Sequence, residues 1–116
     1  MTPTQRSKAY LERAGYLVAV VERWNQWAHI RQDLWGFADL LAFRKGMPVM
    51  LVQTTDASNV SKRRAKILAN ATAREWVMAG HEIVLHGWGK RGKRGERKTW
   101  TCEPEWLTVD QFKEAT

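Results

Sequence analysis

Cysteine is nearly absent from this chain of 116 residues, which contains only Cys102. A single thiol excludes an intramolecular disulfide, and a reducing cytoplasm is the expected setting. The histidines His29, His81 and His86 have no cysteine pair at zinc-binding spacing, so no structural zinc is expected. No window approaches the roughly 20 apolar residues that span a bilayer, and residues 1–16 have no apolar core of signal-peptide length. We therefore expect a cytoplasmic protein with no membrane partner.

Acidic residues are outnumbered, with 12 Asp and Glu against 19 Lys and Arg, and the formal charge is +7. A positive surface attracts phosphates and gains free energy by releasing their counterions. Nucleic acid is therefore the leading candidate for a partner. The alternative is a ribosome-like or merely soluble basic protein. The length suits one core, and we expect residues 1–116 to form a single domain.

The first half of the chain is expected to form one helix and a meander of three strands. A helix over about 4–14 ends before a glycine, and a strand follows over 16–24. The near-continuous apolar run of that strand is typical of burial on both faces. A loop over 25–36 leads to two strands, 37–43 and 49–55, and the turn between them, "RKGMP", contains Gly and Pro.

The second half is expected to form one long helix, two strands and a short helix. The long helix covers 58–80, the strands 81–88 and 98–106, and the short helix 108–115. A flexible basic loop over 89–98 separates the two strands. The order predicts an α/β fold with an α-β-β-β-α-β core, in which a mixed central sheet is flanked by helices.

Cations gather on the long helix and in the basic loop. An apolar stripe of the helix is expected to face the sheet, and it consists of Val60, Ile67, Leu68, Ala71 and Met78. A neighbouring polar stripe of the helix can contact phosphates, and it consists of Arg63, Lys66, Asn70 and Arg74. Lys62 lies outside the stripe and is a further candidate for binding nucleic acid. The loop is expected to bind a phosphate backbone without sequence choice through Lys90, Arg91, Lys93, Arg94, Arg97 and Lys98.

Seven tryptophans are many for this length, and most are expected to be core or interface anchors. Trp88 and Trp100 flank the basic loop, and Trp27 and Trp35 lie in the loop over 25–36. These positions make a minority of the tryptophans candidates for stacking on unpaired bases.

Polar residues at the ends of the three meander strands indicate a site. If the hairpin is symmetric about its turn glycine, Asp39 lies directly across from Gln53. Glu22 and Thr55 end at the same edge of the sheet, and the preceding loop adds Asp33. Oxygen ligands beside phosphate-binding cations are what Mg²⁺-assisted phosphodiester chemistry requires. The alternative is a hydrogen-bonded Asp-Gln-Thr network that only fixes the strand register.

The segments "ERAGYLV", "GFADLLAF" and "VMLVQTT", a hairpin and a long basic helix resemble the core of the PD-(D/E)xK nuclease superfamily. The likeness covers roughly residues 5–88 by order of elements, and the small Holliday-junction resolvases and VRR-NUC-type nucleases are the most similar members. It implies a restriction-endonuclease-like core, Mg²⁺ or Mn²⁺ as cofactor, and DNA as partner. It also implies a homodimer, because resolvase-like members act as dimers.

The resemblance assigns roles to individual residues. Asp39 matches the aspartate that binds the metal, Gln53 stands where a second acid is expected, and Thr55 stands where a lysine is expected. Gln5 stands near where resolvases carry a glutamate. The superfamily tolerates migration of such groups, so the missing negative charge is assigned to Glu22 or Asp33. The missing cation is assigned to the adjoining helix, where the candidates are Lys62, Arg63 and Lys66.

Three functions follow as hypotheses. The first is a metal-dependent endonuclease of branched or otherwise structured DNA, with Asp39 and Gln53 as ligands, Thr55 orienting water or phosphate, and Lys66 as the cation. The second is a catalytically silent nuclease-fold protein that binds nucleic acid. The third is a small phage-type protein whose Trp-rich surface binds another protein.

Overall fold

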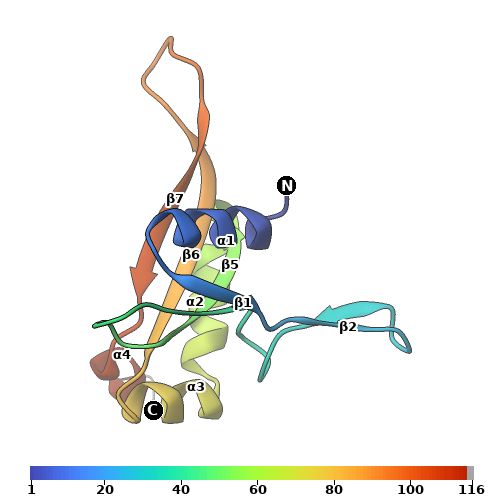
Figure 1. Ribbon diagram of the computed structural model, residues 1–116, viewed down its shortest axis with the longest axis vertical. Helices are drawn as coiled ribbons and strands as arrows, with labels where there is room; N and C mark the ends of the chain where they lie inside the picture. The colour runs from blue at the N-terminus through green and yellow to red at the C-terminus, as the bar shows by residue number, and fades with distance from the viewer. Residues whose placement is uncertain (115–116) are drawn as a thin grey trace.

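A five-stranded mixed sheet forms the centre of the computed structural model, which describes residues 1–114 (Figure 1). The strand order is β1-β4-β5-β6-β7, and only the β5–β6 pair is parallel. The strands are β1 (Leu17–Val20), β4 (Leu40–Phe43), β5 (Met50–Asp56), β6 (Glu82–Arg91) and β7 (Thr99–Trp106). Because a parallel pair needs a crossover, the chain between β5 and β6 runs through helices. These are η1 (Ala57–Asn59), α2 (Val60–Leu68) and α3 (Ala71–Met78).

The sheet buries an apolar cluster on each face. Side chains of a strand alternate between faces, so Leu51 and Val52 belong to different clusters. One cluster joins the sheet to α2, α3 and α4 (Val109–Glu114). The other joins it to α1 (Pro3–Arg13) through Leu11. The predicted α/β fold with helices flanking a mixed sheet is therefore confirmed.

A polar contact fixes α1 on the sheet. Ser7 is fully buried on α1, and its Oγ accepts a hydrogen bond from Trp88 Nε1 at 2.8 Å and lies 2.9 Å from His86 Nδ1. Tyr10 packs edge-on against both rings. Burial lowers the pKa of His86 to about 4, so the imidazole is neutral in the folded protein.

The local elements of the meander follow the sequence closely. Helix α1 ends at Arg13, and Gly15, two residues later, takes a φ of 90°. In the hairpin Leu41 pairs with Leu51, as expected for symmetry about Gly46. The two late strands and the last helix also lie where they were expected. The expected end of that helix, at residue 115, lies outside the described residues.

Strand β1 lies at the edge of the sheet, and the expectation of burial on both faces is wrong. Its exposed fraction is 64% at Leu17 and 48% at Val20. A side chain of an apolar strand is buried only where another layer covers it, and β1 is an edge strand that pairs with β4 alone. No helix among residues 1–114 is long and apolar enough to cross a membrane.

The expected long helix is broken into two. Asn70 separates α2 from α3, and its side chain accepts a hydrogen bond from the amide of Ala73 at 2.9 Å as an N-cap. The break rotates α3, so that Ala73 and Val77 are buried while Met78 is 38% exposed. The expected apolar stripe is therefore correct at Ile67 and at the half-buried Val60 and Leu68, which pack against the same cluster, and wrong at Ala71 and Met78.

Two hairpins project from the body as arms (Figure 1). The first, the β2–β3 arm, consists of β2 (Arg23–Asn25), β3 (Ile30–Gln32) and their turn. It lies in the segment expected to be a loop and also takes the end of the strand expected over 16–24, because β1 ends at Val20. The second, the β6–β7 arm, extends the last two strands to the tip at residues 92–98. All residues from 91 to 100 are exposed.

The expectation that most tryptophans are core or interface anchors is wrong as far as the core is concerned. Trp88 is buried and Trp76 is half-buried. The other five are between 45% and 87% exposed, and they are Trp24, Trp27, Trp35, Trp100 and Trp106.

Candidate metal centre

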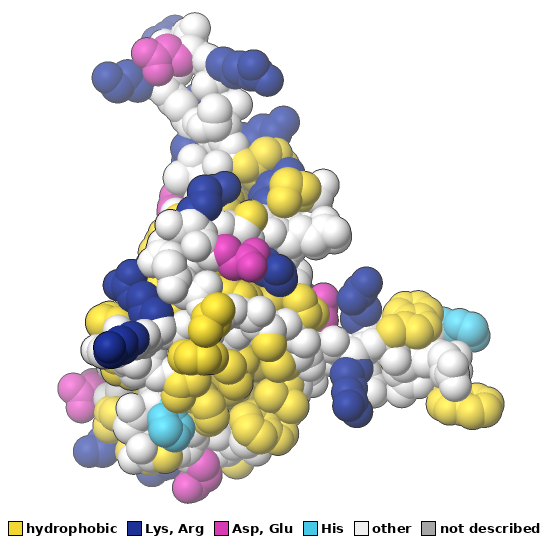
Figure 2. All heavy atoms as spheres, in the orientation of Figure 1, with side chains coloured by type: hydrophobic (Ala, Val, Ile, Leu, Met, Phe, Trp, Pro, Cys, Tyr) yellow, Lys and Arg dark blue, Asp and Glu magenta, His cyan; other side chains and the backbone are white. Residues whose placement is uncertain are grey.

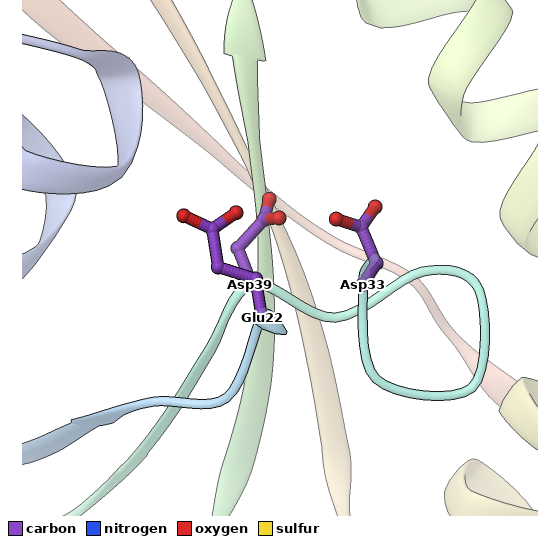
Figure 3. A group of neighbouring side chains, drawn as sticks. All are labelled: Glu22, Asp33 and Asp39. Atoms are coloured by element: carbon purple, nitrogen blue, oxygen red, sulfur yellow. The ribbon is translucent and has the colours of Figure 1, made fainter. Parts of the chain in front are cut away.

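Three carboxylates meet at the edge of the sheet where β1 and β5 end and β4 begins. Glu22 follows β1, Asp39 precedes β4, and Asp33 follows the β2–β3 arm. One oxygen from each lies within 4.8 Å of the others. Figure 3 shows the Asp39 carboxylate between those of Glu22 and Asp33, with the three side chains pointing the same way. The predicted convergence of these residues at one edge is confirmed.

Asp39 is held by the end of β5. It is 4% exposed, and its Oδ2 accepts hydrogen bonds from Gln53 Nε2 at 2.8 Å, from the amide of Thr54 at 2.8 Å and from the Thr54 hydroxyl at 3.2 Å. The predicted Asp39–Gln53 pair is therefore formed. All three donors use Oδ2, so Oδ1 carries none of these bonds.

The three carboxylates bring negative charge together in a partly buried site. Burial, followed by the hydrogen bond and charge of Asp39, raises the pKa of Asp33 to about 6. Burial also raises the pKa of Asp39, and the nearby charge of Glu22 adds to the effect. The hydrogen bond to Asp33 and the amide of Thr54 oppose that rise. Carboxylates that lie this close are stabilised by protons or by cations.

Cations surround the carboxylates. Arg31 Nη1 lies 3.3 Å from Glu22 Oε1, and the charge of Lys66 lowers the pKa of Asp33. Arg63 and Lys66, from α2, line the same cleft of about 730 Å³ as Asp33 and Asp39. A phosphate in this cleft would therefore lie among both carboxylates and cations.

The donor set fits a hard divalent ion. Three carboxylates supply the oxygen ligands that Mg²⁺ and Mn²⁺ prefer. Gln53 is 2% exposed, and its Oε1 has no hydrogen-bond partner among the described residues. A buried carbonyl oxygen without a partner costs about 1–3 kcal/mol, and a cation is one way to satisfy it.

Some predicted site residues lie elsewhere. Thr55 is buried opposite Gly87 and does not line the cleft; its neighbour Thr54 contacts Asp39 instead. Lys62 lies in a neighbouring groove that also contains Arg63 and Lys66. Arg74 lies on α3, and its guanidinium is 3.5 Å from the carbonyl oxygen of Phe112, so it does not belong to the cleft.

The cations of the basic loop are exposed on the β6–β7 arm, which Figure 2 shows with Lys and Arg at its tip. Three of them make contacts with their own hairpin, and one is Lys90, whose Nζ lies 5.5 Å from the centre of the Trp100 ring. Arg91 Nε lies 3.1 Å from Glu103 Oε1, and Lys98 Nζ donates to the carbonyl oxygen of Gly92 at 2.8 Å.

The sequence did not indicate three residues of the cleft. Thr54 alternates away from Gln53 along β5, but its amide lies in the plane of the sheet and reaches Asp39. Thr4 comes from α1, and its hydroxyl lies 3.0 Å from that of Thr54. Arg31 reaches Glu22 only because the β2–β3 arm forms. The alternation of side chains along a strand does not predict the contact of Thr4 or that of Arg31.

Comparisons of the chain with models of known protein families, with curated proteins and with solved structures found no match.

Proposed function

We propose that the protein is a divalent-metal-dependent endonuclease of the PD-(D/E)xK type that acts on DNA. The observation that carries the proposal is the cluster of Glu22, Asp33 and Asp39, whose oxygens lie within 4.8 Å of one another beside Arg63 and Lys66. Like charges at this distance cost free energy unless a proton or a cation binds them, and a divalent ion is the cation that this set of oxygen donors fits. The net charge of +7 supports a polyanion as substrate.

In this proposal Asp33, Asp39 and Glu22 hold Mg²⁺ or Mn²⁺. The bound ion supplies a Lewis acid for the phosphate and lowers the pKa of a bound water. The hydrogen bonds from Gln53 and Thr54 to Asp39 Oδ2 fix its carboxylate, so that Oδ1 stays available.

The cations of α2 orient the substrate. Arg63 and Lys66 line the cleft. In this proposal they contact phosphate oxygens, and Lys66 supplies the cation that the resemblance expects at the position of Thr55. Their charge also stabilises the negative charge that develops on the phosphate in the transition state.

A silent nucleic-acid binder is the second candidate. The observation that favours it is the hydrogen bond from Gln53 Nε2 to Asp39, because a neutral amide stands where a second acid of β5 would strengthen ion binding. Such a protein would bind DNA with a steep salt dependence and without a metal requirement.

Cleavage and binding of labelled linear, single-stranded and four-way-junction DNA, with Mg²⁺, Mn²⁺ or EDTA, test the proposal. The variants are Asp39→Asn and Glu22→Gln, which keep the size of each side chain, and Asp56→Asn is the matched control on an exposed carboxylate at the end of β5. We expect metal-dependent cleavage that falls at least about 100-fold in both site variants and is unchanged in the control.

Calorimetric titration of Mn²⁺ into each protein shows whether lost activity reflects a lost ion. Binding that is present in the wild type and in Asp56→Asn, and absent in Asp39→Asn, supports the proposal. DNA binding without cleavage or ion binding under every condition would instead establish the silent binder.

A further inference from the structure

The β2–β3 arm is an ordered hairpin that holds aromatic side chains in solvent. Its turn is closed by Asn25, whose Oδ1 accepts hydrogen bonds from the amides of Trp27 and Ala28 at 3.0 Å each. The exposed fraction is 87% for Trp27 and 57% for Trp24. A two-stranded hairpin that packs on no other sheet is only marginally stable in water. The exposed tryptophans of the arm therefore do not contribute to the stability of the core.

The arm carries only positive charge. Residues 23–32 contain two Arg, one His and two Trp, and no Asp or Glu. Trp24 pairs across the hairpin with Arg31, so the two side chains are neighbours on one face. Figure 2 shows Lys or Arg side chains beside hydrophobic ones on this arm. Aromatic faces beside guanidinium groups suit a ligand with π-faces and phosphates.

The root of the arm opens into the carboxylate cleft. Arg31, Gln32 and Trp35 all line the cleft. A second groove of about 460 Å³ shares Gln32 and Trp35 with it and adds Arg23 from the arm. Trp35 is 50% exposed. A polymer whose phosphate lies at the carboxylates can therefore continue along the arm without leaving the surface.

We propose that Trp24 and Trp27 stack on unpaired bases, and that the substrate is nucleic acid with an unpaired segment next to the phosphate in the cleft. This rests on the proposed function, because it takes the same cleft as the phosphate site. The bases must be unpaired, since a base inside a duplex already has both faces stacked and exposes only its edge in a groove. Arg23 is then placed to pair with a phosphate between the stacked bases, whereas Arg31 stays paired with Glu22.

Fluorescence anisotropy of two labelled DNA hairpins with the same number of nucleotides tests the proposal. One hairpin is fully paired, the other carries an unpaired extension, and both are measured with Ca²⁺ at one salt concentration. We expect the double variant Trp24→Ala, Trp27→Ala to lose about tenfold or more in affinity for the partly unpaired hairpin. Its affinity for the paired hairpin should change by less than about twofold, because the phosphate contacts remain.

Two further variants separate stacking from general apolar contact. Trp27→Phe keeps an aromatic face and should retain most of the affinity, whereas Trp27→Leu should lose it. Trp106→Ala is the control, because Trp106 is 49% exposed on β7, which β6 separates from β5, and it lines neither the cleft nor the groove beside the arm. It should leave the preference for the unpaired hairpin intact. Thermal unfolding of each variant reports whether the fold is kept.

Several outcomes would overturn the proposal. These are an equal loss on both hairpins, no loss on either, or equal binding by the Phe and Leu variants. A change of mass in sedimentation without any change in DNA binding would also overturn it and would make the arm a protein contact. The binding experiment requires no cleavage, so the stacking role and the nuclease activity can fail independently.

Discussion

Replacing Asp33 with Asn is expected to stabilise the protein at neutral pH. The surroundings raise the pKa of Asp33 from 3.8 to about 6, which means that the folded state resists ionisation of this carboxyl. A rise of roughly 2 pKa units, at about 1.4 kcal/mol each, corresponds to about 3 kcal/mol. Asn keeps the shape without the charge, and part of the gain is lost with the 3.4 Å hydrogen bond from Gln53. The expected increase in the free energy of unfolding is about 1–3 kcal/mol.

The pH dependence gives this effect a sign that can be checked. Below about pH 4 Asp33 is protonated in both the folded and the unfolded chain, so wild type and variant should have equal stability. Between pH 4 and 6 the unfolded carboxyl ionises first, and the wild type loses stability relative to Asp33→Asn. Above about pH 6 the carboxyl is ionised in both states, and the difference should be constant.

Urea unfolding followed by circular dichroism at pH 4, 5, 6, 7 and 8 in EDTA measures the difference directly. Asp56→Asn, at an exposed position, should show no comparable rise. Mg²⁺ should then stabilise the wild type by about 2.7 kcal/mol at 100 times its Kd, and reduce the advantage of Asp33→Asn. A variant that is as stable as the wild type or less stable at pH 8 in EDTA would refute the reasoning, because the carboxylates would then not repel one another.

Three further perturbations concern the scaffold. In the Asp33→Asn variant, which lacks the opposing effect of Asp33, acidification from pH 6.5 to 4 should lower the free energy of unfolding by up to about 3 kcal/mol through His86, whose folded pKa is about 4, and NMR should find its ring still neutral at pH 5.5. Arg64 donates two hydrogen bonds to Glu105, both of 2.6 Å. A double-mutant cycle should give a coupling energy of about 1 kcal/mol between the two residues, and additive effects of the single variants would contradict this. Gly87→Ala should destabilise by about 1–3 kcal/mol in thermal unfolding, because its Cβ would lie 2.6 Å from Val60 Cγ2, and Val60→Ala in the same chain should relieve the clash.

The β4–β5 hairpin and its polar pair were predictable because strand geometry is local. A short turn around Gly46 fixes the register, and the register alone places Asp39 opposite Gln53. The position of Glu22 followed from the antiparallel order of the meander. Three of the four residues predicted as metal ligands therefore form the carboxylate cluster, and Gln53 contacts two of them.

What the sequence did not reveal depends on contacts between distant segments. An apolar run such as that of β1 can form an edge strand or a central strand, so its position at the edge of the sheet could not be predicted from the sequence. The break at Asn70 did have a local signal, since Asn is a preferred N-cap, but the continuous helical pattern on both sides concealed it. The β2–β3 arm, in contrast, is a short hairpin with tryptophans turned to solvent, which contradicts the usual burial of aromatic residues.

The β6–β7 arm begins where the buried part of its strand ends: in β6 the residues from Ile83 to Gly89 are buried, whereas Lys90 and Arg91 are exposed. Changes of length or composition beyond that point remove no core contacts. The β2–β3 arm forms its own two-stranded sheet, apart from the five strands of the body. Under the proposed function, either arm can therefore change what the protein contacts without a change in its core, and each is a site where a different hairpin can be grafted.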